Sequence, residues 1–416
     1  MNSPASAVTA APVNANAKRT ARLDGLKARR KLWLKVHLWL GLSLGLFLAL
    51  IGLTGSVLVF WQEIDRALNP ALYVSARAGG DHQSLDSIFA AAERVAPPAW
   101  ESAWADAPTA ANGNYVFGFY YPSGSQSPES AQSLNIAIDP YTAEPAGRRV
   151  FYHASNPLKH SLMGFFFKLH YALLLGDTGV TVVGIFGVLF LVSVLSGLIL
   201  WWPLTGKWRR VLTIKRRASR ERFNHDLHQS AGFYSLAVML ALLVSGIYFN
   251  LPEQFRWLVG QFSELSPEPA IPAHASPGQA GALDRAIERA RRDFPGGVAQ
   301  YYTWEGGTHR RFQACYRDVE SLRYKVMNDR CLVFDPASGA LLQVQDAEHG
   351  SAGDVFMLWQ WPMHSGRVFG WTGRILVFVT GLLCPLLFAT GLIRWLQKRK
   401  SAKAKLRARI ALNNIV

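Results

Sequence analysis

The sequence is poor in charged residues and contains no Cys-x-x-Cys-His motif. Charged residues make up 17% of the chain, whereas about 25% is typical of soluble domains. The absence of the motif excludes covalent attachment of a c-type haem. Apolar residues take the place of the missing charge and make up 50% of the chain. This composition is unusual for a soluble protein and favours a membrane protein.

Four apolar runs account for the composition. Each has about 20 residues, the length that a helix needs to cross the core of a bilayer. The runs cover residues 36–60, 180–202, 230–249 and 373–395. One buried helix of a soluble domain could imitate such a run, but four runs with charged flanks predict four transmembrane helices.

Positive charge gathers beside these runs. The segments 18–35, 207–222 and 394–409 each hold eight Lys or Arg residues. Because basic residues concentrate in short cytoplasmic segments, we expect both termini in the cytoplasm and the two long connections on the outer side of the membrane. Topology and anionic lipid head groups then explain the net charge of +16, and nucleic acid is not expected as a partner.

Two of the three cysteines, Cys315 and Cys331, fall in the second long connection, on what are expected to be neighbouring strands. An oxidising compartment would permit a disulfide between them. Strand register cannot be read from sequence, so the bridge stays an open alternative. Cys384 stands alone in the last run and is expected to be a small packing residue.

The apolar runs and their flanks repeat two patterns at fixed offsets. The first and third runs carry a histidine, a glycine at +4, and a hydroxyl residue followed by glycine at +17 and +18. These residues are His37, Gly41, Thr54 and Gly55 in the first run, and His228, Gly232, Ser245 and Gly246 in the third. The second and fourth runs follow the pattern His-x5-Gly-x-Thr-Gly, with a hydroxyl residue and glycine 17 and 18 residues later. These residues are His170, Gly176, Thr178, Gly179, Ser196 and Gly197, and then His364, Gly370, Thr372, Gly373, Thr390 and Gly391.

The two long connections also repeat one order of elements, an amphipathic helix, several strands and a turn that contains proline. The expected helices are 84–95 and 283–294, the strands 115–121, 134–138, 301–304, 311–316 and 323–334, and the turns 139–142 and 335–339. The predicted fold class is a membrane α-helical protein of four transmembrane helices with two outer α+β domains, internally duplicated in parallel orientation. The expected order is a cytoplasmic tail 1–35, span 36–60, outer domain 61–179, span 180–202, cytoplasmic loop 203–229, span 230–249, outer domain 250–372, span 373–395 and tail 396–416.

The repeated histidines are the candidate site residues. Ionisable residues beside a span are a functional hypothesis by default. The repeat places His37 and His228 at the inner ends of their helices, and His170 and His364 just before the outer ends of theirs. Two imidazoles on facing helices suit six-coordinate haem iron, so the pattern predicts two b-type haems, one for each pair.

Several alternatives accompany this prediction. Any single histidine could be an interfacial residue that bonds a head group, and zinc would compete, although its sites usually gather three or four ligands. His225 lies three residues before His228 and could replace it, but it has no counterpart before His37. His160 precedes His170 by ten residues and has no counterpart in the second half of the chain. The other histidines are expected to be surface residues of the two long connections; they are His82, His153, His274, His309 and His349.

Several features of this sequence resemble those of a known protein family. The order of elements, the His-x3-Gly starts, the Ser-Gly-Leu-Ile-Leu-Trp-Trp-Pro sequence of 196–203 and the Asp-Leu-His sequence of 226–228 are similar to the PepSY-associated transmembrane proteins. The resemblance covers residues 31–399 and implies a protein of the bacterial inner membrane whose two outer domains are PepSY-like and periplasmic. Some members are haem-containing ferric-siderophore reductases of iron uptake. It also implies that the haem ligands are His37, His228, His170 and His364, with His225 as an alternative. The turn at 139–143 lacks the glycine found at Gly339.

The function expected from residues and resemblance together is transmembrane electron transfer, with a ferric-siderophore or other ferric chelate as acceptor. No side-chain acid or base is required for the electron transfer, so no catalytic residue is expected beyond the haems. The arginines of the periplasmic domains could cradle an anionic complex or be plain surface residues; they are Arg148, Arg149, Arg310, Arg311 and Arg367. The basic segments contain no nucleotide-binding glycine loop, so the electron donor would be a separate cytoplasmic protein or a quinol.

Two rival functions belong to other classes. The protein could be a siderophore permease, or a membrane anchor whose periplasmic domains bind a protein partner. Neither rival needs four histidines at repeated positions, and the spans show almost no polar groups for permeation. A b-type cytochrome that oxidises quinol would differ from the expected reductase only in its donor and acceptor.

Overall fold

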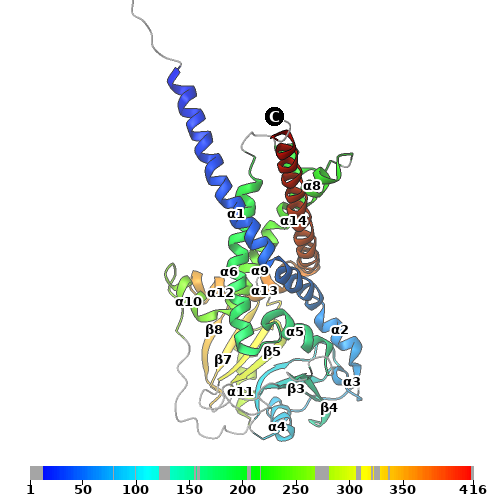
Figure 1. Cartoon of the computed structure of the whole chain (residues 1–416). Helices are drawn as coiled ribbons and strands as arrows, with labels where there is room; N and C mark the ends of the chain where they lie inside the picture. The colour runs from blue at the N-terminus through cyan, green and yellow to red at the C-terminus, as the bar shows by residue number, and fades with distance from the viewer. Residues whose placement is uncertain are drawn as a thin grey trace, which may run out of the picture. The chain divides into compact units, whose positions relative to one another are not determined.

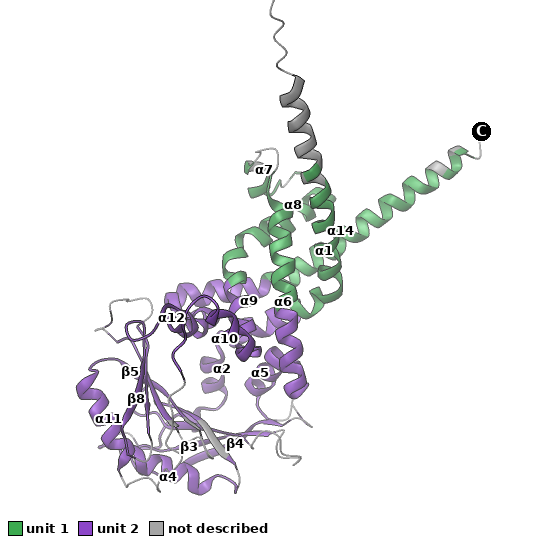
Figure 2. Cartoon of the chain, turned by 90° about the vertical axis from the view of Figure 1, so that its left-hand side faces the viewer, with its two compact units in different colours: residues 1–49, 188–240, 383–416 green, residues 50–187, 241–382 purple. Residues whose placement is uncertain are grey.

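The chain divides into two compact units in a computed structural model (Figure 2). Unit 1 contains residues 1–49, 188–240 and 383–416, and unit 2 contains residues 50–187 and 241–382. The structure describes residues 13–77, 79–98, 100–120, 132–153, 156, 160–203, 208–215, 217–267, 281–305, 311–319, 322, 328–335 and 338–413. Each of the helices α1 (Val13–Leu58), α6 (Gly176–Trp201) and α14 (Gly370–Asn413) contributes residues to both units.

Three helical segments of the described chain are long and apolar enough to cross a membrane. They are Ala28–Leu58, Gly176–Trp201 and Arg367–Ala408, which lie in α1, α6 and η2–α14. They correspond to the first, second and fourth predicted spans.

The third predicted span, 230–249, is not one straight helix. Helix α8 (Arg220–Tyr234) and helix α9 (Leu236–Asn250) meet at an angle of 60°, and only together do they qualify as a span. The bend lies at Ser235, whose hydroxyl donates a hydrogen bond of 2.8 Å to the carbonyl of Ala231. Serine hydroxyls that bond back to the preceding turn often bend a helix, and no proline is needed for this.

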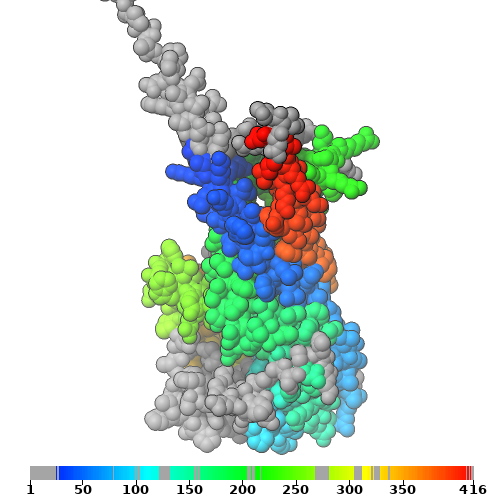
Figure 3. Space-filling model, in the orientation of Figure 1, coloured from blue at the N-terminus to red at the C-terminus, as the bar shows by residue number. Residues whose placement is uncertain are grey.

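Small residues bring the helices together within each unit. In unit 1 a Cβ on Gly45 of α1 would lie 2.5 Å from the Phe388 ring of α14, so the glycine admits the ring. Figure 3 shows these two helices as the blue and the red segments. In unit 2 the Ser56 hydroxyl of α1 donates a hydrogen bond of 2.8 Å to the carbonyl of Phe378 in α14. Close approach of this kind is how helices pack in the absence of water.

The two long connections build one antiparallel sheet of eight strands in unit 2 (Figure 1). Its strands are β1 (Glu101–Asp106), β2 (Tyr115–Tyr120), β3 (Gln132–Ile138), β4 (Pro145–His153), β5 (Val298–Glu305), β6 (Arg311–Arg317), β7 (Arg330–Phe334) and β8 (Leu341–Gln345). The order β4-β3-β2-β1-β5-β6-β7-β8 consists of two four-stranded meanders that meet at their first strands. The α+β character of these segments is therefore confirmed, and the pairing of β1 with β5 joins them in a single sheet.

Helices α4 (Leu85–Val95) and α11 (Ala282–Asp293), both predicted from sequence, cover one face of this sheet. Their buried side chains pack on Phe117, Phe312 and Phe334 of the strands. Each helix also caps the other, because Asp284 accepts a hydrogen bond of 2.7 Å from the backbone nitrogen of Leu85 and Asp86 accepts one of 2.9 Å from that of Asp284.

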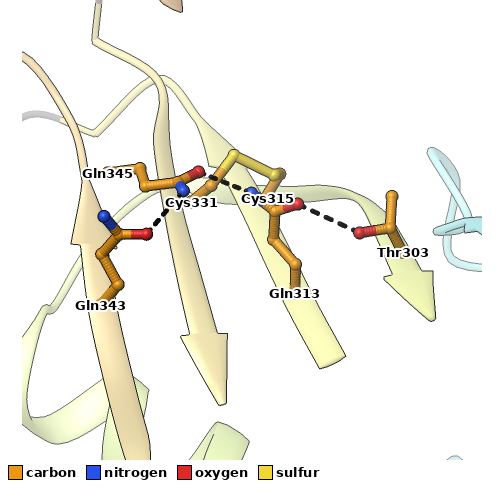
Figure 4. Close-up of a disulfide and its surroundings, with 6 residues drawn as sticks. All are labelled: Thr303, Gln313, Cys315, Cys331, Gln343 and Gln345. Atoms are coloured by element: carbon orange, nitrogen blue, oxygen red, sulfur yellow. Dashed lines mark hydrogen bonds between the residues drawn. A yellow bond between two sulfur atoms is a disulfide. The ribbon is translucent and has the colours of Figure 1, made fainter. Parts of the chain in front are cut away.

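The opposite face of the sheet carries polar residues, because side chains alternate between the two faces of a strand. Cys315 of β6 and Cys331 of β7 lie directly opposite each other there and form a disulfide (Figure 4). Gln313 receives a hydrogen bond of 3.0 Å from Thr303 and donates one of 2.8 Å to Gln345. The covalent bond and the amide ladder together tie β5, β6, β7 and β8 side by side.

Short helices surround this second face and connect the sheet to the long helices. They are α2 (Trp61–Leu68), α3 (Pro70–Tyr73), α5 (Leu162–Ala172), α10 (Pro252–Gly260), α12 (Ala352–Leu358), α13 (Gln360–Ser365) and the 3-10 turn η2 (Arg367–Phe369), all in unit 2. The remaining short helix, α7 (Trp208–Leu212), belongs to unit 1. Asn250 at the end of α9 donates hydrogen bonds of 2.7 and 2.8 Å to the carbonyls of Tyr171 and Val180. These bonds hold the turn between α5 and α6.

Candidate functional site

The four histidines that the repeats single out form two pairs, one in each unit. In unit 1 the rings of His37 on α1 and His228 on α8 have their centres 6.2 Å apart. In unit 2 the ring centres of His170 on α5 and His364 on α13 are 6.1 Å apart. The pairs are those that the repeated offsets predict.

His225 belongs to neither ring pair. Its side chain is 44% exposed, and its Nδ1 lies 3.4 Å from Asp226 Oδ1. Helix α8 thus turns His228 toward His37 and leaves His225, which is three residues earlier, at the margin of the helix bundle.

Each paired histidine meets one of the repeated hydroxyl residues through its Nδ1 atom. The distances are 3.2 Å from His37 to Ser196, 2.9 Å from His228 to Thr390, 3.1 Å from His170 to Thr54 and 2.8 Å from His364 to Ser245. His37 and His170 also direct Nδ1 at the carbonyls of Ser193 and Ile51, at 2.9 and 3.0 Å.

These contacts determine which ring nitrogen carries the hydrogen. Each of the four hydroxyls donates its one hydrogen to a carbonyl of its own helix, as Thr390 does to Leu386 at 2.7 Å and Ser245 does to Ala241 at 2.7 Å. The hydroxyl oxygen therefore accepts, and Nδ1 of the histidine is the donor. The lone pair of each neutral imidazole is left on Nε2, the atom with which a histidine held in this way binds a metal.

The glycine that follows each hydroxyl gives the imidazole its room. A Cβ built on Gly55 would lie 2.9 Å from the ring of His170, and one built on Gly197 would lie 3.1 Å from the ring of His37. In the second half of the chain, a Cβ on Gly246 would lie 3.6 Å from His364 and one on Gly391 would lie 3.5 Å from His228. The hydroxyl–glycine pairs of the repeat thus support the histidines, a role that the sequence analysis did not assign to them. Their recurrence at fixed positions in all four runs was the available indication.

The support crosses from one helix to the next. Thr54-Gly55 follows His37 in α1 but contacts His170, and Ser196-Gly197 in α6 contacts His37. The second half of the chain repeats this exchange, with Ser245-Gly246 beside His364 and Thr390-Gly391 beside His228. A single helix cannot provide this arrangement, because residues 17 and 18 apart lie about 26 Å from each other along its axis.

The pattern His-x5-Gly-x-Thr-Gly builds the turn after His170 and after His364. A Cβ on its last glycine would lie 1.8 Å from the carbonyl oxygen of Ala172 in the first copy and 2.1 Å from that of Gly366 in the second. In both copies this carbonyl belongs to the second residue after the histidine. Gly179 and Gly373 are therefore required for the short helix to fold back on the long one.

The geometry of each pair fits a shared metal-centred group. Two imidazoles that bind one ion from opposite sides place each nitrogen about 2 Å from it, which puts the ring centres about 6 Å apart. One turn after His37, a Cβ on Gly41 would meet no atom of another helix within 4 Å, so the space beside this glycine is open. Among the described residues, no three His, Cys, Asp or Glu side chains gather as the usual zinc site requires.

The arginines of unit 2 differ in their roles. Arg149 is bound to Asp65 at 2.5 Å and supports the fold, while Arg148 is exposed. Arg367 donates a hydrogen bond of 2.8 Å to Gln62 and lines a cavity. Arg310 and the Arg311 side chain lie outside the described residues, as do His274 and His309.

Comparison with protein families gives one match. The model of the family described as the PepSY-associated TM region covers residues 34–398 of this chain. No curated protein matches the sequence.

Proposed function

Because this chain belongs to the PepSY-associated transmembrane family, we propose that it is a di-haem b oxidoreductase of the bacterial inner membrane that reduces ferric iron held by a periplasmic siderophore. The support for this proposal is the geometry of the two histidine pairs. All four imidazoles have Nδ1 engaged as a donor and Nε2 left for a metal.

His37 and His228 would hold one haem, and His170 and His364 the other. A haem held by two histidines would supply one-electron transfer, at a potential that depends on burial and on hydrogen bonds to its ligands. The residues of this chain orient the four rings and fix their tautomer. The electron donor in this proposal is a cytoplasmic protein or a quinol.

We further propose four spans, with α8 and α9 together forming the third, and an internal duplication of the whole chain. The repeated offsets and the two meanders of the sheet favour the duplication. The three basic segments favour cytoplasmic termini and a periplasmic sheet. The His37–His228 pair would then serve the cytoplasmic side and the His170–His364 pair the periplasmic side.

Iron is the substrate in this function and changes its affinity on reduction. Oxygen-donor chelators bind Fe(III) more tightly than Fe(II), because the ferrous ion is larger in radius and smaller in charge. One electron is therefore enough to release the metal, and the protein need not break a bond of the chelator. The same chemistry would serve any ferric chelate that reaches the periplasmic pair.

The proposal is tested by the visible spectrum of the detergent-purified full chain, oxidised and reduced, with haem quantified as its pyridine adduct. We expect about two haems b per chain. His37→Ala and His364→Ala should each lose one of them, and the double variant should lose both. His225→Ala is the matched control, because His225 neighbours His228 on the same helix but belongs to no pair, and it should retain both haems.

Other outcomes are equally definite. A protein that stays colourless after supplementation with haem would overturn the reductase and leave the siderophore permease or the membrane-anchored partner-binding protein as the function. A haem protein that reduces no ferric chelate would instead be an electron carrier for another acceptor.

A further inference from the structure

Unit 2 contains a cavity of about 330 Å³ between the polar face of the sheet and the short helices. Its size is at the lower end of the range of about 300–1,000 Å³ found for ligand pockets. Aromatic rings make up most of its wall; they are Trp61, Trp104, Tyr120, Phe151, Phe167, Tyr171, Tyr301 and Trp361. The cavity would hold a small ligand or one part of a larger one.

The cavity lies beside the His170–His364 pair. Tyr171 follows His170 on α5, and both Trp361 and Arg367 lie three residues from His364. The Phe249 ring connects the two places, because its centre is 5.4 Å from that of His364 and 5.8 Å from that of Trp361. A ligand in the cavity would therefore be close to the group that this pair holds.

Two polar groups of the wall, those of Ser133 and Lys168, have no hydrogen-bond partner among the described residues. The hydroxyl of Ser133 is on a residue only 3% exposed, and no hydrogen-bond partner for it occurs among the described residues. Lys168 places its ammonium 5.0 to 6.0 Å from the centres of three tyrosine rings, those of Tyr171, Tyr152 and Tyr120. A cation and an unpaired hydroxyl in an aromatic cavity are suited to a ligand whose surface carries negatively polarised oxygen atoms.

Asp106 is the one carboxylic acid among the residues that line this cavity. It is the last residue of β1, and its side chain shares the polar face with Trp104 and Tyr301. No described side chain forms a hydrogen bond or an ion pair with it, although Arg66 on α2 and Arg367 on η2 attract its charge. Its other titratable neighbours are Tyr73 on α3, Tyr301 on β5 and, across the cavity, Lys168 on α5.

Burial raises the pKa of Asp106 to about 7, against the opposing attraction of Arg66 and Arg367. A carboxyl group with this pKa carries a proton in about half of the molecules at neutral pH and can release it. The electron transfer itself needs no acid, but the oxygen atoms that leave the reduced iron need protons.

We propose that Asp106 donates a proton to a chelating oxygen of the ferric complex that is bound in this cavity. The inference rests on the proposed function, which supplies the electron. Fe(III) gains one electron and becomes Fe(II), one iron–oxygen bond breaks, and the freed oxygen forms a bond to the proton of the Asp106 carboxyl. The carboxylate that remains takes a proton from water before the next turnover. Lys168 and Ser133 hold the complex by hydrogen bonds to its negatively polarised oxygen atoms.

The first test reads the carboxyl group and the binding site without any turnover. Infrared difference spectra of the full chain should show the carbonyl band of a protonated acid that titrates near pH 7 and is missing in Asp106→Asn. Asp81→Asn, at an exposed position far from the cavity lining, should keep the band. Gallium(III) acetohydroxamate, which cannot be reduced, should quench the tryptophan fluorescence of both variants with an affinity within about threefold of wild type.

The second test follows single-turnover reduction of ferric acetohydroxamate by the pre-reduced protein. A positioned general acid commonly contributes about 10²-fold or more, so Asp106→Asn should react about 100-fold more slowly below pH 7. This ratio should shrink by about tenfold for each pH unit above 7, where the wild-type acid has lost its proton. Asp106→Glu should restore most of the rate.

Equal rates of wild type and Asp106→Asn at every pH would overturn the proton transfer but not the proposed function. Loss of gallium complex binding in Asp106→Asn would also overturn it, because Asp106 would then be a binding residue. Wild-type protein that binds the gallium complex but reduces no ferric complex would overturn the proposed function, and the proton transfer with it.

Discussion

The imidazole of His170 lies directly against Gly55, so closely that a Cβ on residue 55 would be 2.9 Å from its Cε1 atom. Thr54, the residue before that glycine, receives the hydrogen bond from Nδ1 of the same ring. Two adjacent residues of α1 thus determine both the position and the tautomer of a histidine that is 115 residues away in the sequence.

This contact predicts that Gly55→Ala displaces His170 and removes the haem of the His170–His364 pair. The methyl group cannot be accommodated unless the ring moves, because such short contacts are not tolerated in a packed interior. Gly246→Ala is the matched control, since its Cβ would lie 3.6 Å from the ring of His364, an ordinary contact distance. We expect about one haem per chain in Gly55→Ala and about two in Gly246→Ala by the pyridine assay. Full haem content in Gly55→Ala would contradict the role assigned to the glycine.

The hydroxyl partners predict a second effect, on affinity. Thr390→Val keeps the shape of the side chain but removes the oxygen that accepts the 2.9 Å hydrogen bond from His228 Nδ1. Loss of such a supporting bond typically weakens metal affinity by about 10–100-fold. Transfer of haem from the purified protein to an excess of a haem-binding acceptor should therefore be faster for Thr390→Val. Thr390→Ser retains the oxygen and should behave as wild type, and equal rates for the valine and serine variants would show that the bond has no such role.

The sequence indicates which histidines pair because repeated helices carry their histidines at equivalent positions along the helix axis. His37 and His228 occupy such equivalent positions, and the centres of their rings are 6.2 Å apart in the structure. Whether they bind haem stays a prediction. The partners Thr54-Gly55 and Ser196-Gly197 are visible in the same repeat, but their role requires knowing which helices are neighbours. Sequence offsets contain no such information.

Other elements could not be read from the sequence for different reasons. Strand β4 (Pro145–His153) begins with proline and carries Arg148 and Arg149, so its composition resembles that of a loop. Its identity comes from pairing with β3 at the edge of the sheet. The bend at Ser235 lies in an unbroken apolar run and depends on a hydrogen bond that a sequence pattern does not encode.

A third prediction concerns the stability of unit 2. Asp65 is 1% exposed and accepts hydrogen bonds from Arg149 and Tyr73, so its charge is compensated entirely inside the protein. Burial and the neighbouring Asp65 raise the pKa of Tyr73, which keeps its phenol as a donor. Asp65→Asn leaves Arg149 without its partner, and breaking a buried pair in this way costs about 3–5 kcal/mol of unfolding free energy.

The control for this prediction lies on the same helix. Glu63 forms an ion pair of 2.7 Å with Arg374, but its side chain is 50% exposed. Exposed pairs contribute about 0–1 kcal/mol, so Glu63→Gln should change stability little. Thermal unfolding of the detergent-solubilised protein should place Asp65→Asn well below both wild type and Glu63→Gln. Indistinguishable transitions for the two variants would refute the prediction.

A fourth prediction concerns the Cys315–Cys331 disulfide, which closes a loop with a sequence separation of 16 residues. A cross-link over a loop of about this length stabilises a protein by about 3 kcal/mol, chiefly through the unfolded chain. The double variant Cys315→Ser, Cys331→Ser should therefore unfold at lower denaturant concentration than wild type. Its haem content should be unchanged, because neither cysteine contacts a paired histidine. Wild-type protein treated with a reductant should reproduce the stability of the double variant, and an unchanged midpoint would contradict the prediction.

Stability should also fall in acid, through Asp346 at the end of the sheet. Burial alone would raise the pKa of this carboxyl group, but hydrogen bonds from His349 at 2.8 Å and Arg330 at 2.7 Å outweigh it and hold the pKa below its usual value. A carboxylate whose pKa is lower in the folded than in the unfolded protein stabilises the fold above the unfolded pKa of about 3.9. That contribution is lost as the pH falls through the lower, folded pKa.

The variant Asp346→Asn has no carboxyl group to titrate at this position, so it is the reference against which the pH dependence of the wild-type stability is measured. Wild type should be more stable than the variant at pH 7, because Arg330 is only 7% exposed and would lose its partner. The difference should narrow from about pH 4 downward as the wild-type carboxylate takes up its proton. Urea unfolding of both proteins at a series of pH values measures this difference in unfolding free energy. A difference that stays constant down to the acid unfolding of the protein would mean that the charge of Asp346 does not support the sheet.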